Sequence, residues 1–170
     1  MKMSFDRRTV LLGGTAVLAL CAAAMFFRNM GVSPTTAAEG TFEVTMTEDE
    51  WKKKLSPEAF EVLRHENTEY PGTSPLLNEH RAGTFSCAGC DLALFDAGTK
   101  YDSGTGWPSF YQPISSTAVG ETTDSSIGMS RTEVHCSRCG GHLGHVFNDG
   151  PQPTGLRYCM NGVALTFTAA

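Results

Sequence analysis

Hydrophobic positions recur at helical spacing in only two short stretches, both before Asn67. The first stretch opens with the sequence TEDE at residues 47–50, a capping-box pattern that predicts a short helix directly after it. The sequence SP at residues 56–57 predicts a second helix, because Ser is a favoured N-cap and Pro a favoured first helical residue. Phe60 and Leu63 fall on one face of that helix.

After Asn67 the apolar runs become short and are separated by clusters of Gly, Pro, Asp and Ser, a pattern typical of antiparallel strands joined by turns. The predicted strands cover residues 84–86, 92–95, 131–135, 146–147, 156–161 and 163–167. We therefore expect a mainly β domain of antiparallel sheets with short N-terminal helices, extending over residues 47–170.

The first 38 residues have a different pattern. Arg7 and Arg8 precede an uncharged run over residues 9–27, and residues 33–38 offer small side chains suited to a signal peptidase. This segment is expected to be an export signal or, because the uncharged run approaches the length of a transmembrane helix, a membrane anchor. The arginine pair resembles a twin-arginine signal, although Asp6 stands where that motif usually has a small hydroxyl residue.

Export would place the domain outside the cytoplasm, in the periplasm, and attached to the membrane if the leader is not cleaved. From Glu39 onward the chain has nine Lys and Arg against seventeen Asp and Glu, a net formal charge of −8. Nucleic acid and anionic lipid are held by clustered cations, so this charge disfavours both as partners. We expect a monomer that binds no nucleic acid.

Four cysteines form two CxxC pairs, Cys87 with Cys90 and Cys136 with Cys139. Four thiolates at this spacing are a tetrahedral ligand set for one structural Zn²⁺. The pairs are separated by 45 residues, so the metal is expected to join two distant hairpins as a pair of zinc knuckles. The alternative is two redox-active CxxC motifs, although neither pair opens a helix in a strand–helix pattern.

Cys159 is the cysteine beyond the leader that lacks such a partner, which makes it a candidate nucleophile. If residues 156–161 form a strand, the side chains of Arg157, Cys159 and Asn161 lie on one face. Arg157 would favour the thiolate form, and Asn161 would supply a neutral hydrogen-bond donor. A single cysteine on a strand is also commonly a small buried hydrophobe, and that alternative stays open at this point.

His142 and His145 follow the second CxxC pair and are flanked by glycines. Imidazole is suited to proton transfer near neutral pH, so both are candidates for acid–base chemistry. The alternatives are additional zinc ligands or hydrogen-bonded core residues. Ordinary surface or packing roles are expected for the remaining histidines, His65, His80 and His135.

Trp107 and Phe110 lie among Gly and Pro in the segment SGTGWPSF at residues 103–110. Aromatic side chains in such a loop either form a binding surface or close over the core. The loop alone does not distinguish the two.

The motifs CAGC, SGTGWPSF, RTEVHCSRCGGHLGHVF and DGPQPTGLRYCMN together resemble the methionine-R-sulfoxide reductase family, the B-type enzymes, from residue 47 to the C-terminus. The resemblance implies an antiparallel β fold with a structural zinc, and a peptide-methionine (R)-S-oxide reductase acting on oxidised proteins or peptides. It also implies roles for individual residues. Cys159 would be the nucleophile, Trp107 would receive the substrate methyl group, His142, His145 and Asn161 would surround the sulfoxide oxygen, and Phe147 and Arg157 would shape and charge the pocket.

The implied reaction is attack of the Cys159 thiolate on the sulfoxide sulfur while a protonated histidine, His145, donates to the oxygen, giving methionine and a cysteine sulfenic acid. Many members have a resolving cysteine before Gly-Trp-Pro, whereas this chain has Thr105, so an external thioredoxin-like thiol donor is expected. Gly162 replaces a common Ser and is expected to loosen the last strand. Two other classes remain open, an inactive zinc-ribbon interaction module and a disulfide exchanger working through CxxC.

Overall fold

The computed structural model describes residues 41–126 and 128–170. The export signal or anchor expected over residues 1–38 lies outside the described residues. Within the described ranges, the helices are all too short or too polar to span a bilayer.

Two α-helices open the described chain, α1 (Glu48–Lys54) and α2 (Pro57–His65), and both helix predictions are confirmed. Thr47 and Glu50 form the expected capping box: the Glu50 carboxylate accepts the Thr47 N–H at 2.8 Å, and the Thr47 hydroxyl accepts the Glu50 N–H at 3.4 Å. Ser56 caps α2 by accepting the Ala59 N–H at 3.1 Å. Glu66, in the left-handed conformation at φ 57°, ends α2.

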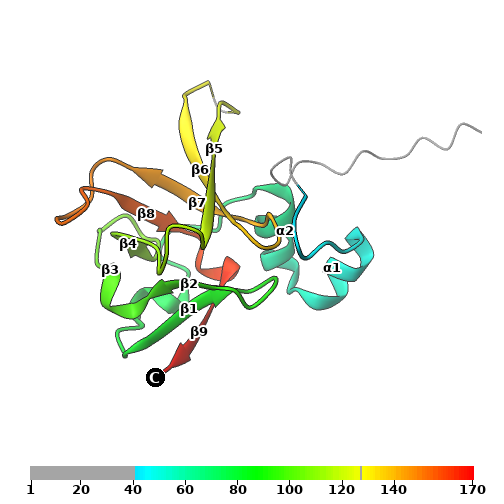
Figure 1. Ribbon diagram of the computed structural model, residues 1–170, viewed down its shortest axis with the longest axis horizontal. Helices are drawn as coiled ribbons and strands as arrows, with labels where there is room; N and C mark the ends of the chain where they lie inside the picture. The colour runs from blue at the N-terminus through cyan, green and yellow to red at the C-terminus, as the bar shows by residue number, and fades with distance from the viewer. Residues whose placement is uncertain (1–40, 127) are drawn as a thin grey trace, which may run out of the picture. The chain divides into compact units, whose positions relative to one another are not determined.

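The strands form two antiparallel sheets (Figure 1). One sheet has the order β2-β1-β9 and the other the order β3-β4-β8-β7-β6-β5. The strands are β1 (Gly83–Cys87), β2 (Ala93–Asp96), β3 (Lys100–Tyr101), β4 (Ser109–Phe110), β5 (Val119–Asp124), β6 (Arg131–Cys136), β7 (His142–Phe147), β8 (Arg157–Met160) and β9 (Leu165–Ala169), with 3₁₀ helices η1 (Pro75–Asn78), η2 (Ala97–Thr99) and η3 (Gly162–Ala164) between them. The mainly β, antiparallel fold class predicted from the sequence is confirmed.

Several strand boundaries differ from the prediction. β3, β4 and β5 were missed, and β7 begins at His142 rather than four residues later. β5 has the polar sequence VGETTD and lies at the edge of its sheet, where few apolar side chains are needed. The expected strand over residues 163–167 begins only at Leu165, because Gly162–Ala164 forms η3.

Aromatic side chains join the two sheets in the core. Phe95 of β2 stacks on Phe110 of β4 with ring centroids 4.4 Å apart, and Phe85 of β1 meets Phe110 edge-on at 5.0 Å. All three are fully buried, and Leu63 of α2 is also buried in this core. The core therefore holds the six-stranded sheet, which carries the site described below, against the three-stranded sheet.

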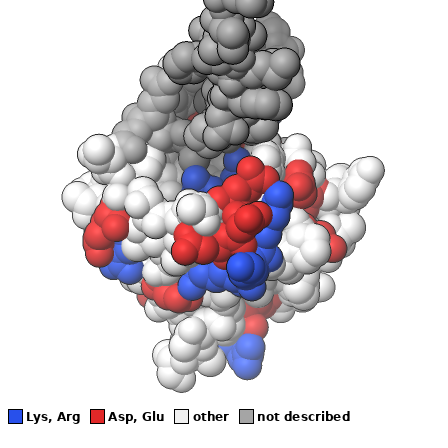
Figure 2. Space-filling model, turned by 90° about the vertical axis from the view of Figure 1, so that its right-hand side faces the viewer, with Lys and Arg blue, Asp and Glu red and all other residues white. Residues whose placement is uncertain are grey.

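Charges of both signs gather on the face that carries α1 (Figure 2). The first turn of α1 is acidic and its last turn is Lys52-Lys53-Lys54. Lys52 pairs with Glu48, and Lys54 lies 4.0 Å from Asp91. Cations on this face are thus neighbours of carboxylates, an arrangement unlike the single-sign basic surface that binds nucleic acid.

Candidate active site and metal centre

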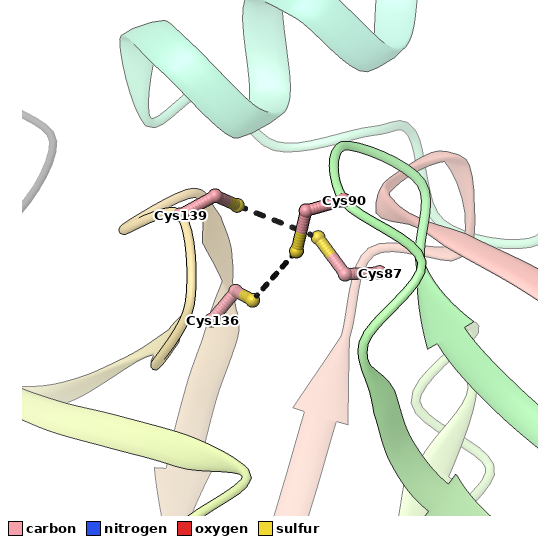
Figure 3. Close-up of side chains that lie close together, drawn as sticks. All are labelled: Cys87, Cys90, Cys136 and Cys139. Carbon is pink, nitrogen blue, oxygen red and sulfur yellow. Dashed lines mark hydrogen bonds between the residues drawn. The ribbon is translucent and has the colours of Figure 1, made fainter. Parts of the chain in front are cut away.

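The four CxxC cysteines converge in space (Figure 3). Their Sγ atoms all lie within 4.8 Å of one another. Cys87 Sγ is 3.7 Å from Cys139 Sγ, and Cys90 Sγ is 3.5 Å from Cys136 Sγ. A tetrahedral Zn²⁺ with Zn–S bonds of about 2.3 Å holds its sulfurs about 3.8 Å apart, so the cluster fits one tetrathiolate metal ion.

Each pair of cysteines lies on a tight knuckle at the end of a strand. The Asp91 N–H donates to the Cys87 carbonyl at 2.8 Å, and the Gly140 N–H donates to the Cys136 carbonyl at the same distance. Gly140 has φ 67°, and a Cβ at this position would lie 2.4 Å from the Phe42 ring, so a larger residue would not fit. One knuckle follows β1 and the other follows β6. A bound metal would therefore join the β1–β2 and β6–β7 hairpins, as expected from the spacing of the pairs, and these hairpins belong to different sheets.

Cys159 lies in β8 in the middle of a row of residues that crosses the six-stranded sheet. Its register partner on β4 is Ser109 and its partner on β7 is His145. Tyr101 of β3 is the next residue in the row, opposite Ser109. Directly opposed residues project from the same face of a sheet, so this pairing places the candidate nucleophile beside the candidate acid.

The alternation predicted along β8 holds for four residues. Tyr158 and Met160 are buried, whereas Arg157 and Cys159 are partly exposed on the other face. Asn161 departs from this pattern, because β8 ends at Met160 and Asn161 is the buried N-cap residue of η3. Asn161 Oδ1 accepts the backbone N–H of Glu69 at 3.0 Å, and its Nδ2 donates to the Leu143 carbonyl at 3.1 Å.

Each candidate histidine is bonded to a carboxylate. His142 Nδ1 lies 2.8 Å from Glu133 Oε1, and His145 Nε2 lies 2.9 Å from Asp124 Oδ2. The two imidazole rings are 5.4 Å apart. His142 is 2% exposed, and among the described residues its Nε2 has no hydrogen-bond partner, so this nitrogen is available to a ligand.

The surroundings of His145 act in opposite directions on its protonation. Burial lowers the pKa of His145, the positive charge of Arg131 lowers it further, and the hydrogen bond to Asp124 opposes both. The pKa of Asp124 is held well below its usual range, chiefly by hydrogen bonds from Ser126, with His145 and Arg131 contributing. Asp124 therefore stays ionised beside the imidazole.

Trp107 is held through the segment that follows α2. Its indole N–H donates to the Glu69 carbonyl at 3.1 Å, and the Gly72 N–H donates to the Gly106 carbonyl at 2.8 Å. The Glu69 carboxylate accepts the N–H groups of Gly162 at 2.5 Å and Val163 at 3.1 Å. Glu69 thus connects the Trp107 loop, Asn161 and η3, a role that no local sequence pattern indicated.

Gly162 is buried against Ser74 of the η1 N-terminus. A Cβ at residue 162 would lie 1.8 Å from the Ser74 hydroxyl oxygen, so only glycine fits this contact. The residue begins η3 rather than lying in the last strand. The loosening expected for that strand therefore has no counterpart here, since Gly162 packs tightly.

Arg157 is paired with a carboxylate and stacked on an aromatic ring. Its Nε and Nη2 bond the two carboxylate oxygens of Asp149 at 2.8 and 2.9 Å, and its guanidinium lies 4.3 Å from the centre of the Phe147 ring. The bond to Asp149 is the main reason that the pKa of Arg157 is raised, and Cys159 adds to the same effect. Asp149 is a further site residue that the sequence analysis did not identify.

Hydroxyl groups line the other side of Cys159. Thr105 Oγ1 lies 3.8 Å from Cys159 Sγ and 2.8 Å from Ser103 Oγ. Ser103 Oγ in turn lies 2.7 Å from Ser109 Oγ, which bonds the Trp107 carbonyl at 3.1 Å. Hydroxyls of the partly buried Thr105 and Ser103 and of the buried Ser109 thus occupy the space beside the thiol and connect it to the Trp107 loop.

Of the other histidines, His135 is buried, and its ring meets Phe42 edge-on at 6.0 Å. His65 packs edge-on against Phe60 at 4.9 Å. Both have the packing roles expected for them. Of the residues predicted for a site, the structure brings two sets together: the four cysteines of the candidate metal centre, and the residues around Cys159.

Comparison with known proteins gives one consistent family. Residues 55–169 match the SelR domain. A Leptospira interrogans protein named peptide methionine sulfoxide reductase MsrB is 54% identical over 126 residues, which are 74% of this chain and 96% of the relative. MsrB proteins from Pseudomonas putida and Leifsonia xyli are 56% and 50% identical over 74% and 77% of this chain, and 94% and 95% of their own lengths. With a matching domain over most of its length and such identity across nearly complete relatives, this chain belongs to the peptide methionine sulfoxide reductase MsrB family.

Proposed function

We propose that the protein is a peptide-methionine (R)-S-oxide reductase with Cys159 as its nucleophile. The observation that carries the proposal is the register of β7 and β8, which sets Cys159 directly opposite His145 in a chain of the MsrB family. The substrates are oxidised proteins or peptides bearing methionine-R-sulfoxide.

In the proposed reaction the Cys159 thiolate attacks the sulfoxide sulfur. This attack forms a bond between the two sulfurs while His145 gives a proton to the oxygen. The resulting hydroxyl group then passes to the cysteine sulfur, and both its bond to the substrate sulfur and the bond between the two sulfurs break. The substrate sulfur is reduced by two electrons to the thioether of methionine, and Cys159 is oxidised by two electrons to the sulfenic acid. Because Asp124 occupies Nε2 of His145, Nδ1 is the nitrogen that would carry the transferred proton.

The remaining residues surround this reaction. We assign the substrate methyl group to Trp107. We assign contact with the sulfoxide oxygen to His142, whose buried Nε2 has no hydrogen-bond partner within residues 41–126 and 128–170. Asn161 has one amide hydrogen left after its bond to Leu143, and we assign it to the same oxygen. Phe147 and Arg157 form the wall of the pocket, with Asp149 fixing the guanidinium.

We propose that the metal is one zinc ion held by Cys87, Cys90, Cys136 and Cys139. Four sulfur ligands fill a tetrahedral shell, so the ion is structural and keeps no open position for substrate. Thiolates bound to such an ion are unavailable for disulfide exchange, which argues against the CxxC exchanger.

The sulfenic acid must be reduced from outside the domain. Four of the five described cysteines belong to the metal cluster, and the fifth is Cys159 itself. We propose an external thioredoxin-like donor. One donor thiol attacks the sulfenic acid to form a mixed disulfide and release water, and a second donor thiol then displaces the Cys159 thiol and leaves the donor as a disulfide. The leader motif supports a periplasmic location, membrane-anchored if the leader is retained.

An assay on the two sulfoxide epimers of one peptide tests the proposal. The wild-type domain should reduce the R epimer at the methionine sulfur and leave the S epimer, and Cys159→Ser should abolish turnover while the protein stays folded and retains its metal. Equal rates on both epimers, or full activity without the Cys159 thiol, would reject the assignment. If the protein were an inactive zinc-ribbon module, neither the wild type nor the Cys159→Ser variant would show turnover.

A further inference from the structure

Asp124 and Arg131 form a charged pair beside the turn that connects β5 to β6. They are the last residue of β5 and the first of β6, and they are register partners. Arg131 Nη2 and Nε lie 2.5 and 3.0 Å from Asp124 Oδ2. The same carboxylate oxygen is 2.9 Å from His145 Nε2. One oxygen is therefore shared between a permanent cation and an imidazole.

This contact crosses a strand. His145 is in β7, its neighbour toward the sheet edge is β6, and β5 lies beyond β6 at the edge itself, at the top of Figure 1. The side chains of Asp124 and His145 are only 15% and 12% exposed, so water screens their bond weakly. A ring nitrogen that bonds a fixed carboxylate sets both the tautomer and the orientation of the other nitrogen.

The second carboxylate–histidine pair of the site is built differently. His142 and Glu133 are both buried, and their 2.8 Å bond joins residues on the adjacent strands β7 and β6. At His145, Arg131 shares the carboxylate oxygen. The carboxylate that bonds His145 is thus also paired with an arginine, an arrangement that differs from the Glu133–His142 pair.

We infer that Asp124 is a positioning residue for His145, and that Arg131 weakens the hold of Asp124 on the imidazole proton. The inference rests on the proposed function, because it concerns the acid of that reaction. Asp124 fixes the ring through Nε2 and so presents Nδ1 for proton transfer. Without Arg131, the full carboxylate charge would stabilise the imidazolium and make it a poorer donor.

Several titratable and charged groups surround His145, and some of them shift the pKa of its imidazole. The effect of Asp124 on its pKa is upward, and the effects of Arg131 and His142 are downward. Cys159 on β8 and Glu133 on β6 are its register partners. Glu66, at the end of α2, interacts electrostatically with Asp124, Glu133 and His142. The substitutions below alter one charge of this set at a time.

The test is the pH dependence of kcat on an R-sulfoxide peptide. Its alkaline limb reports loss of the catalytic proton in the substrate complex. Asp124→Asn should move that limb to lower pH, because the imidazolium loses the neighbouring negative charge that stabilises it. The variant should also reduce kcat about tenfold to a hundredfold, because the charged hydrogen bond that orients the ring is lost. Arg131→Gln should move the limb to higher pH. Asp124→Glu, which keeps the charge, should restore the limb toward its wild-type position.

Asp96→Asn is the matched control. Asp96 is the last residue of β2 in the other sheet and caps η2, and its substitution changes the net charge equally. It should leave the limb in place. An NMR titration of the His145 ring should show the same opposite shifts in the two variants, independently of turnover. Shifts in one direction for both variants, or lower thermal stability with unmoved limbs, would overturn the inference. A wild-type enzyme inactive on the R epimer would instead reject the proposed function.

Discussion

Thr105 determines how the oxidised enzyme is expected to behave after one turnover. Its hydroxyl lies 3.8 Å from Cys159 Sγ, in the position where a resolving cysteine would attack the sulfenic acid. A hydroxyl does not reduce a sulfenate, and the other described cysteines are in the metal cluster. The sulfenic acid should therefore persist until a thiol arrives from outside.

We predict that, without reductant, mass spectrometry after a single turnover will find Cys159 as a sulfenate that dimedone traps. Peroxide should then convert a larger fraction to the sulfinic acid than in an enzyme with a resolving thiol. An intramolecular disulfide involving Cys159 in the wild-type chain would contradict this scheme.

Thr105→Cys is the matched variant. A sulfur at this position would lie close enough to Cys159 to form a disulfide after small side-chain rotations, so the variant should give an internal disulfide and lose the dimedone adduct. The same variant should be protected from peroxide. If it behaves as the wild type, Thr105 does not occupy the resolving position.

Among the elements, η3 packs closely against the N-terminus of η1. Gly162 fills this contact, with Ser74 on the opposite side. We predict that Gly162→Ser lowers the free energy of unfolding by about 1–3 kcal/mol, the usual cost of overpacking. Chemical denaturation of the variant and the wild type measures this difference.

The control is the double variant Gly162→Ser with Ser74→Gly, which vacates the space that the new side chain needs. It should recover part of the stability, although Ser74 also caps η1 through the Leu76 N–H and that bond is lost. Strictly additive losses in the double variant would show that the two residues do not compete for this space.

At the scale of the elements, local sequence patterns predicted the features that depend only on neighbouring residues. The capping box at Thr47 and the alternation over the four residues of β8 needed only neighbouring residues, and both are confirmed. The alternation fails at Asn161, which lies beyond the end of β8. β5 was missed because its strand pairing comes from β6, while its own side chains are mostly polar and exposed. Asp124 belongs to this strand, so the partner of His145 could not be found without the sheet.

Pairing between distant segments also explains the other omissions. Glu69 acts on Trp107 and Asn161 from 38 and 92 residues away along the chain, through backbone groups that every residue possesses. The CxxC pairs, by contrast, were found from the sequence, because their spacing is itself a requirement of the metal. Site residues can thus be predicted when their chemistry requires a particular residue type at a particular spacing. They cannot be predicted from a local pattern when they act through backbone groups that only the folded chain brings near the site.

For the whole molecule, the metal centre is the link whose loss should matter most. A metal ion bound by the four cysteines would join a knuckle after β1 in one sheet to a knuckle after β6 in the other. Structural zinc binds with about 10–16 kcal/mol, comparable to the roughly 5–15 kcal/mol that stabilises a whole domain. Cys136→Ser should therefore lower thermal stability far more than it alters the chemistry of the fraction that remains folded.

Metal analysis and thermal unfolding, with and without chelator, check this prediction. The purified domain should contain one zinc per chain. The activity remaining in Cys136→Ser, counted per folded molecule, should be close to that of the wild type. A metal-free wild-type domain with normal thermal stability would show that the sheets hold together without the ion.

The metal also bears on the route of export. Tetrathiolate cysteines are oxidised easily before they bind zinc, so an unfolded chain that reached an oxidising compartment would risk disulfides in place of the metal site. Loading zinc in the cytoplasm and exporting the folded protein avoids this risk, and a twin-arginine signal directs such export. We therefore predict that replacing both Arg7 and Arg8 by Lys retains the folded, zinc-loaded enzyme in the cytoplasm, as measured by fractionation and activity. Unchanged export of this variant would argue for the general secretory route, with zinc bound after translocation.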